Sequence, residues 1–253
     1  MRLHGDFQDG KNPPINASDV TPVFTVARVR PTRVVMILDT SGSMSELPAR
    51  KDGRIPQNCQ RKFGKEREEY TENRYLKLAD AARNFITSVA LDGSYIGIVD
   101  FDSDGLIIEY LTLIDSDETR HMLAKRVPED ADGGTCIGCG LEKGLEVLSE
   151  NGANPEGGVV VLITDGQDNG GNEDFRDQMK KEYVAAGVVI DAVAFSNTAE
   201  ETLIELQEET GGRFYLQTDD PGSTGLHDAF QATMERNVKD YDRRIVVGYK
   251  SIT

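Results

Sequence analysis

The sequence predicts an α/β fold: a doubly wound, mostly parallel six-stranded sheet with one antiparallel edge strand and helices on both faces. Three observations support this prediction. Two continuous apolar runs, at 34–38 and 159–163, are each followed closely by an aspartate, as is typical of strands buried on both faces. Segments with one apolar stripe at helical spacing alternate with the strands. The turn signal at 103–105 joins two strand-like segments into a hairpin.

The expected elements follow one another in a regular order. After the strand at 34–38, apolar residues three or four apart predict a helix over 78–89, and the hairpin strands follow at 95–99 and 106–113. The pattern Asp-Ser-Asp-Glu at 115–118 resembles a capping box, which opens a short helix that ends before Pro128. The later elements are a helix around 141–148, a strand at 159–163, a helix at 175–187, a strand at 188–195, a helix at 198–211, a strand at 213–216 and a helix at 226–234.

The chain divides into three parts on composition. Residues 1–32 are polar and interrupted by prolines, which predicts an extended N-terminal flank or linker. Residues 33–236 carry the alternating elements and form the α/β domain. Within it, residues 46–70 hold seven Lys or Arg between positions 50 and 67 and are expected to form an exposed basic insertion. Residues 237–253 are expected to form a linker and the start of a truncated following domain.

Composition and motifs narrow the function. The 253 residues have a formal net charge of −16, which argues against nucleic acid or an anionic membrane face as a partner. No apolar run approaches the ~18–20 residues that would cross a bilayer. The first residues also lack the charged segment followed by an apolar segment that is typical of a signal peptide. These features fit either an intracellular protein or a piece of a longer secreted chain. The chain has no zinc-protease, serine-hydrolase or P-loop motif and no visible nucleophile–base pair, so we expect no enzymatic activity.

Five oxygen-bearing side chains are expected at the carboxyl edge of the sheet. Asp39, Ser41 and Ser43 follow the first buried strand, and Asp165 follows the strand at 159–163. Thr135 lies between them in sequence, after a glycine-rich loop at the start of a helix. Hydroxyl and carboxylate oxygens without His or Cys suit Mg²⁺, Mn²⁺ or Ca²⁺ and argue against zinc or copper. The sequence therefore predicts one divalent-cation site, with Mg²⁺ as the first candidate.

These segments resemble a known motif. Residues 34–44, 133–135 and 162–166 together resemble the metal-ion-dependent adhesion site of a von Willebrand factor type A domain, and the resemblance extends over about 33–236. More narrowly, further segments are similar to the calcium-activated chloride channel regulator family. These segments are residues 6–14, 97–103, 134–140, 164–169 and 225–230. In that family the type A domain lies between a zinc metalloprotease domain and a β-sandwich region, and the protease motif does not occur in this sequence.

The resemblance implies a mechanism of recognition. Ser41, Ser43 and Thr135 would bind the cation directly through neutral hydroxyls, with Asp39 and Asp165 close by, often through water. An ion held by neutral ligands stays electron-poor and can accept a carboxylate from a partner. The implied partner is a membrane protein, a calcium-activated chloride channel in the first instance, whose conductance the domain would modulate from outside the cell or at its surface. The alternatives are an extracellular-matrix adhesion module and a type A subunit of an intracellular ATPase-driven complex.

Cysteines and one asparagine suggest covalent features. Cys136 and Cys139 stand three apart at an expected helix start, where they would either form a disulfide in an oxidising compartment or remain thiols of lowered pKa. Cys59, in the insertion, has no evident partner. Asn16 begins a glycosylation triplet and is a candidate glycosylation site.

Overall fold

The computed structural model describes residues 20–25, 32–45, 74–166, 173–195, 200–218, 223–239 and 246–251. The chain divides into two compact units: Pro31–Lys239 forms one, and Met1–Arg30 with Asp240–Thr253 forms the other. Asn16, Cys59 and the insertion predicted at 46–70 lie outside the described residues.

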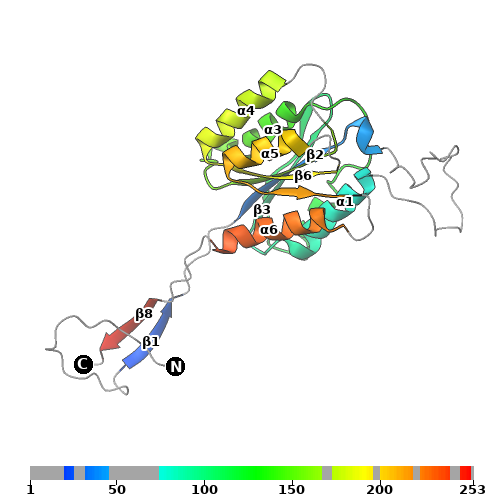
Figure 1. Ribbon diagram of the computed structural model, residues 1–253. Helices are drawn as coiled ribbons and strands as arrows, with labels where there is room; N and C mark the ends of the chain where they lie inside the picture. Colours follow the sequence, from blue (N-terminus) through cyan, green and yellow to red (C-terminus); the bar gives the residue numbers. More distant parts are fainter. Residues whose placement is uncertain are drawn as a thin grey trace, which may run out of the picture. The chain divides into compact units, whose positions relative to one another are not determined.

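The larger unit is built on a six-stranded sheet with the order β4-β3-β2-β5-β6-β7 (Figure 1). All neighbouring strands are parallel except β3 and β4, which form the antiparallel edge. The strands are β2 (Arg33–Asp39), β3 (Tyr95–Phe101), β4 (Gly105–Leu113), β5 (Val159–Thr164), β6 (Val189–Ala194) and β7 (Phe214–Leu216). This sheet confirms the predicted fold class, including the hairpin at residues 103–105.

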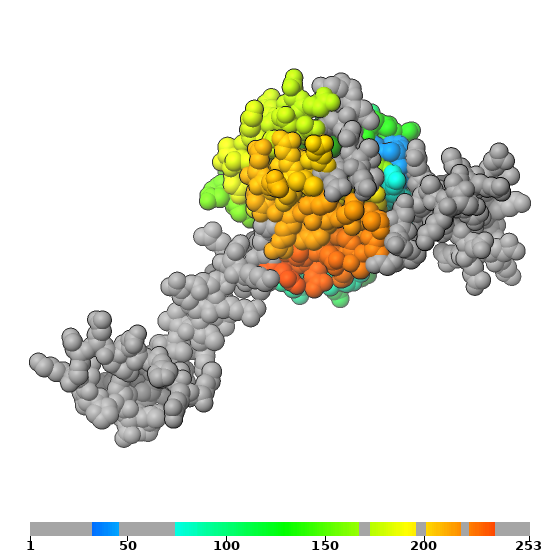
Figure 2. All heavy atoms as spheres, viewed as in Figure 1, coloured from blue at the N-terminus to red at the C-terminus, as the bar shows by residue number. Residues whose placement is uncertain are grey.

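Helices cover both faces of the sheet. They are α1 (Arg74–Asn84), α2 (Asp117–Ala124), α3 (Ile137–Leu148), α4 (Glu173–Ala186), α5 (Glu200–Thr210) and α6 (Gly225–Lys239), with short turns η2 (Gly42–Ser45), η3 (Phe85–Val89) and η4 (Glu150–Gly152). Val34 and Met36 of β2 pack into the core with α1, α2 and α6, whereas Val35 and Ile37 pack with α3, α4 and α5. On the face shown in Figure 2, α5 lies between α4 and α6. Within the described ranges, every helix is too short or too polar to span a bilayer.

The order of the strands determines where a site can form. From β2 the chain crosses to β3 on one side, and it later returns to β5 on the other side of β2. Ligands of doubly wound sheets bind beyond the carboxyl ends of the strands at such a switch point. Leu38 of β2 pairs with Ile163 of β5, so the strand ends Asp39 and Thr164 lie level with one another.

Local signals in the sequence set the helix boundaries. Ser116 caps α2 by accepting a hydrogen bond from the backbone N–H of Thr119 at 3.2 Å, as the capping pattern predicts. Gly187 ends α4 with φ of +65°, a left-handed conformation that favours glycine. The predicted start of the helix at 198–211 lies outside the described residues, which resume at Glu200.

The described residues of the smaller unit, 20–25 and 246–251, form an antiparallel ribbon. Strands β1 (Val20–Thr25) and β8 (Val246–Ser251) pair from Val20 opposite Ser251 to Thr25 opposite Val246. Nothing in the sequence pattern predicts this pairing, because the whole α/β unit separates the two strands along the chain.

Candidate metal centre

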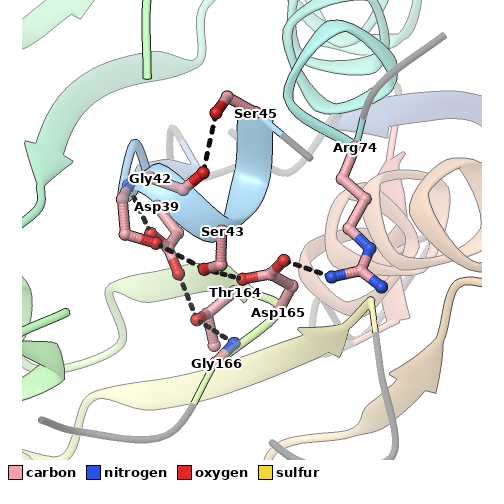
Figure 3. Close-up of polar contacts among 9 residues, drawn as sticks. Asp39, Gly42, Ser43, Ser45, Arg74, Thr164, Asp165 and Gly166 are labelled. Carbon is pink, nitrogen blue, oxygen red and sulfur yellow. Dashed lines mark hydrogen bonds and ion pairs between the residues drawn. The ribbon is translucent and has the colours of Figure 1, made fainter. Parts of the chain in front are cut away.

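Asp39 is the last residue of β2 and is completely buried. Its Oδ1 accepts a hydrogen bond from the backbone N–H of Ser41 at 2.8 Å. Its Oδ2 accepts from the hydroxyl of Thr164, the last residue of β5. The carboxylate thus joins the two strand ends at the switch point (Figure 3). Sequence reasoning missed Thr164, although its position one residue before Asp165 in a fully buried strand could have drawn attention to it.

The η2 turn brings the two serines over the end of β5. Ser43 Oγ donates to Asp165 Oδ1 at 2.7 Å, and Ser41 Oγ lies 3.1 Å from Ser43 Oγ. Figure 3 shows Ser43 and Asp165 pointing toward one another. The structure therefore joins Asp39, Ser41, Ser43 and Asp165, four of the five predicted ligands, in one connected hydrogen-bond network.

Thr135 reaches the same edge because its loop is tied to the loop after β2. The backbone N–H of Gly42 donates to the carbonyl of Gly133 at 3.1 Å, and Gly133 has φ of +92°, which favours glycine. Thr135 is buried. A Cβ built on Gly166 would lie 3.5 Å from Thr135 Oγ1 and 3.9 Å from Ser43 Oγ, so the two hydroxyls flank the same point. We call Asp39, Ser41, Ser43, Thr135 and Asp165 the metal cluster.

An arginine that sequence reasoning missed also reaches the cluster. Arg74, the first residue of α1, places Nη1 2.6 Å from Asp165 Oδ2. The Asp165 side chain is fully buried, and the Arg74 side chain is 22% exposed. Figure 3 shows the guanidinium of Arg74 and the hydroxyl of Ser43 on opposite sides of the Asp165 carboxylate. No motif marks Arg74 in the sequence, because it follows the charged stretch at 46–70 and looks like one more basic residue of it.

Burial controls the electrostatics of the cluster. Desolvation raises the pKa of Asp39 to about 6, although hydrogen bonds from Ser41 and Thr164 oppose the rise and the negative charge of Asp165 adds to it. Burial also raises the pKa of Asp100, whose carboxylate accepts a hydrogen bond from Thr40. A positive ion beside Asp39 would favour its ionised form.

The donor set fits a hard divalent cation. Across the described ranges, no group of three or more His, Cys, Asp or Glu side chains is arranged to hold a metal ion, so the candidate ligands are hydroxyls supported by two carboxylates. An ionised carboxylate accepts but does not donate, so Ser43 donates to Asp165 and accepts from Ser41, which leaves one lone pair of Ser43 Oγ available. The same reasoning applies to Thr164 and Asp39. Oxygen lone pairs of this kind are the ligands that Mg²⁺, Mn²⁺ and Ca²⁺ prefer.

Cys136 and Cys139 form a disulfide at the start of α3, with 5.3 Å between their Cα atoms. Cys136 follows Thr135 directly, and its backbone N–H donates to the carbonyl of Asp102 at 2.6 Å. The bridge therefore closes the first turn of the helix beside the metal cluster.

Comparisons with known proteins find a matching domain family and related sequences. The model of the von Willebrand factor type A domain matches residues 34–167. Calcium-activated chloride channel regulator 1 of Homo sapiens is 30% identical over 253 residues, which cover 100% of this chain and 24% of the relative. Regulator 4 of the same organism is 28% identical over 247 residues, which cover 97% of this chain and 24% of the relative. The chain thus spans about a quarter of the length of these relatives.

Solved structures share the fold at low sequence identity. A von Willebrand factor type A protein from Catenulispora acidiphila has a TM-score of 0.58 at 17% identity, covering 87% of this chain and 51% of its own. Proximal thread matrix protein 1 from the mussel byssus, described with a zinc-occupied MIDAS motif (the metal-ion-dependent adhesion site), has a TM-score of 0.56 at 21% identity, covering 83% and 48%. Both similarities concern the fold.

Proposed function

Since the chain belongs to the von Willebrand factor type A domain family, we propose that it recognises a protein partner through a divalent cation held by the metal cluster. The observation that carries this proposal is the contact of buried carboxylates with hydroxyls at the ends of β2 and β5. Ser43 donates to Asp165 and Thr164 donates to Asp39, so buried carboxylates hold the hydroxyls in place while an oxygen lone pair remains free.

Ser41, Ser43 and Thr135 are the direct ligands in this proposal. Asp39 and Asp165 orient them and supply negative charge without having to touch the ion. Because these ligands are neutral hydroxyls, a divalent cation held by them would keep its positive charge and could attract a carboxylate of the partner. In this proposal the residues of the chain hold the cation where the carboxylate of the partner can reach it, and no covalent bond forms or breaks.

Mg²⁺ is the proposed ion, with Mn²⁺ and Ca²⁺ able to use the same oxygens. The hard donor set favours these ions over zinc in the absence of His and Cys. The zinc described in the mussel protein shows that a related motif accepts a different divalent ion. A competition titration of Mg²⁺ against Zn²⁺ distinguishes the two preferences.

The partner is proposed from the relatives. The similarity to calcium-activated chloride channel regulators supports a membrane protein, in the first instance such a channel, whose conductance the domain modulates. The Cys136–Cys139 disulfide supports a site of action outside the cell or at its surface, since disulfides persist in oxidising compartments. The same bridge disfavours the intracellular ATPase-linked alternative, whereas matrix adhesion would use the same site.

Serine variants test the cation site. Calorimetric titration with Mn²⁺ and with Mg²⁺ should show that Ser41→Ala and Ser43→Ala each bind at least tenfold more weakly, because each loses a direct ligand. Ser45→Ala is the matched control: it lies on the same η2 turn, is exposed and donates to the Gly42 carbonyl at 2.7 Å. If Ser41→Ala bound Mn²⁺ and Mg²⁺ as tightly as wild type, the metal cluster would not be the binding site.

A second experiment tests the partner. The domain is applied to cells that express a calcium-activated chloride channel, and the chloride current is recorded. Wild type and Ser45→Ala should raise the current, while Ser41→Ala and chelation of divalent ions should abolish the effect. A Ser41→Ala domain as active as wild type would show that recognition does not pass through the cation.

A further inference from the structure

Arg74 is held against the metal cluster in a partly buried ion pair. Its Nη1 lies 2.6 Å from Asp165 Oδ2, while Asp165 Oδ1 accepts from Ser43. The Asp165 side chain is fully buried. Arg74 Nε is also buried, and it has no hydrogen-bond partner among the residues that the structure describes. Solvent therefore screens this guanidinium less than that of a surface arginine.

The guanidinium changes the charge of the cluster. Asp39 and Asp165 together carry two negative charges when ionised, and Arg74 reduces this to one. A divalent cation then leaves one net positive charge, whereas without Arg74 the loaded cluster would be neutral. Other acids nearby, such as Asp100, are the same in either case and cancel from the comparison.

We propose that Arg74 is a positioning residue of the metal cluster that weakens its hold on the cation and strengthens its hold on a partner's carboxylate. This inference rests on the proposed function. The positive charge of Arg74, placed against Asp165, repels the cation and attracts the incoming carboxylate. The chain thereby gives up cation affinity in exchange for partner affinity.

Charge predicts the ratio of the two effects. At equal distances, the interaction energy of the guanidinium with a doubly charged cation is about twice that with a singly charged carboxylate. Removing the charge should therefore raise cation affinity by about tenfold and lower carboxylate affinity by about threefold. A purely structural ion pair would change both affinities in the same direction.

Three substitutions at Arg74 separate charge from contact. Arg74→Gln keeps an N–H donor for Asp165 but removes the charge, and Arg74→Met is a second neutral variant. Arg74→Lys keeps the charge. Arg83→Gln is the matched control, because Arg83 also lies on α1 and pairs with Asp80 at 3.5 Å. Thermal unfolding verifies that each variant is folded.

Mn²⁺ serves as the probe ion. Electron paramagnetic resonance measures free Mn²⁺ and hence its affinity, and water-proton relaxation measures acetate as it displaces water from bound Mn²⁺. Arg74→Gln and Arg74→Met should bind Mn²⁺ about tenfold more tightly and acetate about threefold more weakly, while Arg74→Lys and Arg83→Gln stay within twofold of wild type.

The outcomes separate this inference from the proposed function. If wild type binds Mn²⁺ but the neutral variants bind it equally or more weakly, Arg74 is only structural and the inference is overturned. Unchanged acetate affinity in a variant that binds Mn²⁺ more tightly would also overturn it. If wild type binds no Mn²⁺, the proposed function itself is wrong, and the inference falls with it.

Discussion

Two buried aspartates of the sheet make nearly the same hydrogen bonds and have different consequences. Asp39 and Asp191 are both completely buried. Asp39 accepts from a backbone N–H and from the hydroxyl of Thr164. Asp191 accepts from the backbone N–H of Arg213 at 2.9 Å and from the hydroxyl of Thr233 at 3.0 Å.

The difference lies in what surrounds each carboxylate. Asp191 sits within β6, and its partners tie that strand to Thr233 of α6 and to the chain entering β7. Asp39 ends its strand and is followed by the η2 turn, which carries serines toward a second carboxylate, Asp165. A buried, hydrogen-bonded aspartate is therefore not evidence of a site. The informative feature is a set of hydroxyls that donate hydrogen bonds to carboxylates at the end of a strand.

Removing the Asp191 carboxylate should cause the greatest loss of stability. Asp191→Ala should lower the free energy of unfolding by roughly 2–4 kcal/mol, because it leaves the N–H of Arg213 and part of the bonding of Thr233 unsatisfied. Urea denaturation with chelator measures the loss. Mn²⁺ affinity of the folded variant should stay within twofold of wild type, and a tenfold change would show that the two aspartates are coupled.

The raised pKa of Asp39 should make the stability of the protein depend on pH. In chelator, its folded pKa of about 6 lies above the ordinary value of about 3.9, so between these pH values the folded state binds a proton that the unfolded state does not. The free energy of unfolding should therefore fall as pH rises through this window, by up to about 3 kcal/mol from Asp39.

The Asp39→Asn variant isolates that contribution. Urea denaturation at several values between pH 4.5 and 7.5 should show a smaller fall in the variant, because residue 39 no longer titrates. Saturating Mg²⁺ should restore stability to wild type at pH 7 but not to Asp39→Asn. Parallel pH profiles in chelator would contradict the burial argument.

The smallest expected effects come from a matched pair of threonines. Thr164→Val and Thr233→Val each remove one hydroxyl from a buried aspartate without changing side-chain size. Each should lower the free energy of unfolding by about 1 kcal/mol. Only Thr164→Val should also weaken Mn²⁺ binding, by several-fold in calorimetry, because Asp39 loses a hydrogen bond that holds it in place. Equal losses of Mn²⁺ affinity in both variants would erase the distinction.

The fold was predictable because its signals are local. The apolar runs at 34–38 and 159–163, the stripe of α1 and the turn at 103–105 each lie within a few residues of sequence. The predicted ligands were also visible, since each stands at or near a strand end or helix start. What brings them together is the register of β2 against β5, which no local pattern contains.

The missing members of the site depend on contacts between distant residues. Thr164 matters because its hydroxyl reaches Asp39, 125 positions away, and Arg74 because it reaches Asp165, 91 positions away. Neither residue type is unusual for its place in the sequence. The pairing of β1 with β8 likewise depends on contacts between residues far apart in the sequence. A single sequence identifies residues that could bind a cation more readily than residues that hold those ligands in place.

The pairing of β1 with β8 has a mechanical consequence, because β1 precedes the α/β unit in the sequence and β8 follows it. Val20 pairs with Ser251 at one end, and Thr25 pairs with Val246 at the other, where the chain enters and leaves the α/β unit. A pull that separates Val20 from Ser251 loads the ladder one residue pair at a time, as in opening a zipper, rather than shearing all its hydrogen bonds together. Tension applied at Val20 and Ser251 therefore acts first on the six residue pairs of the ribbon. By chain order it acts on the start of β2 and the end of α6 only after those pairs have separated.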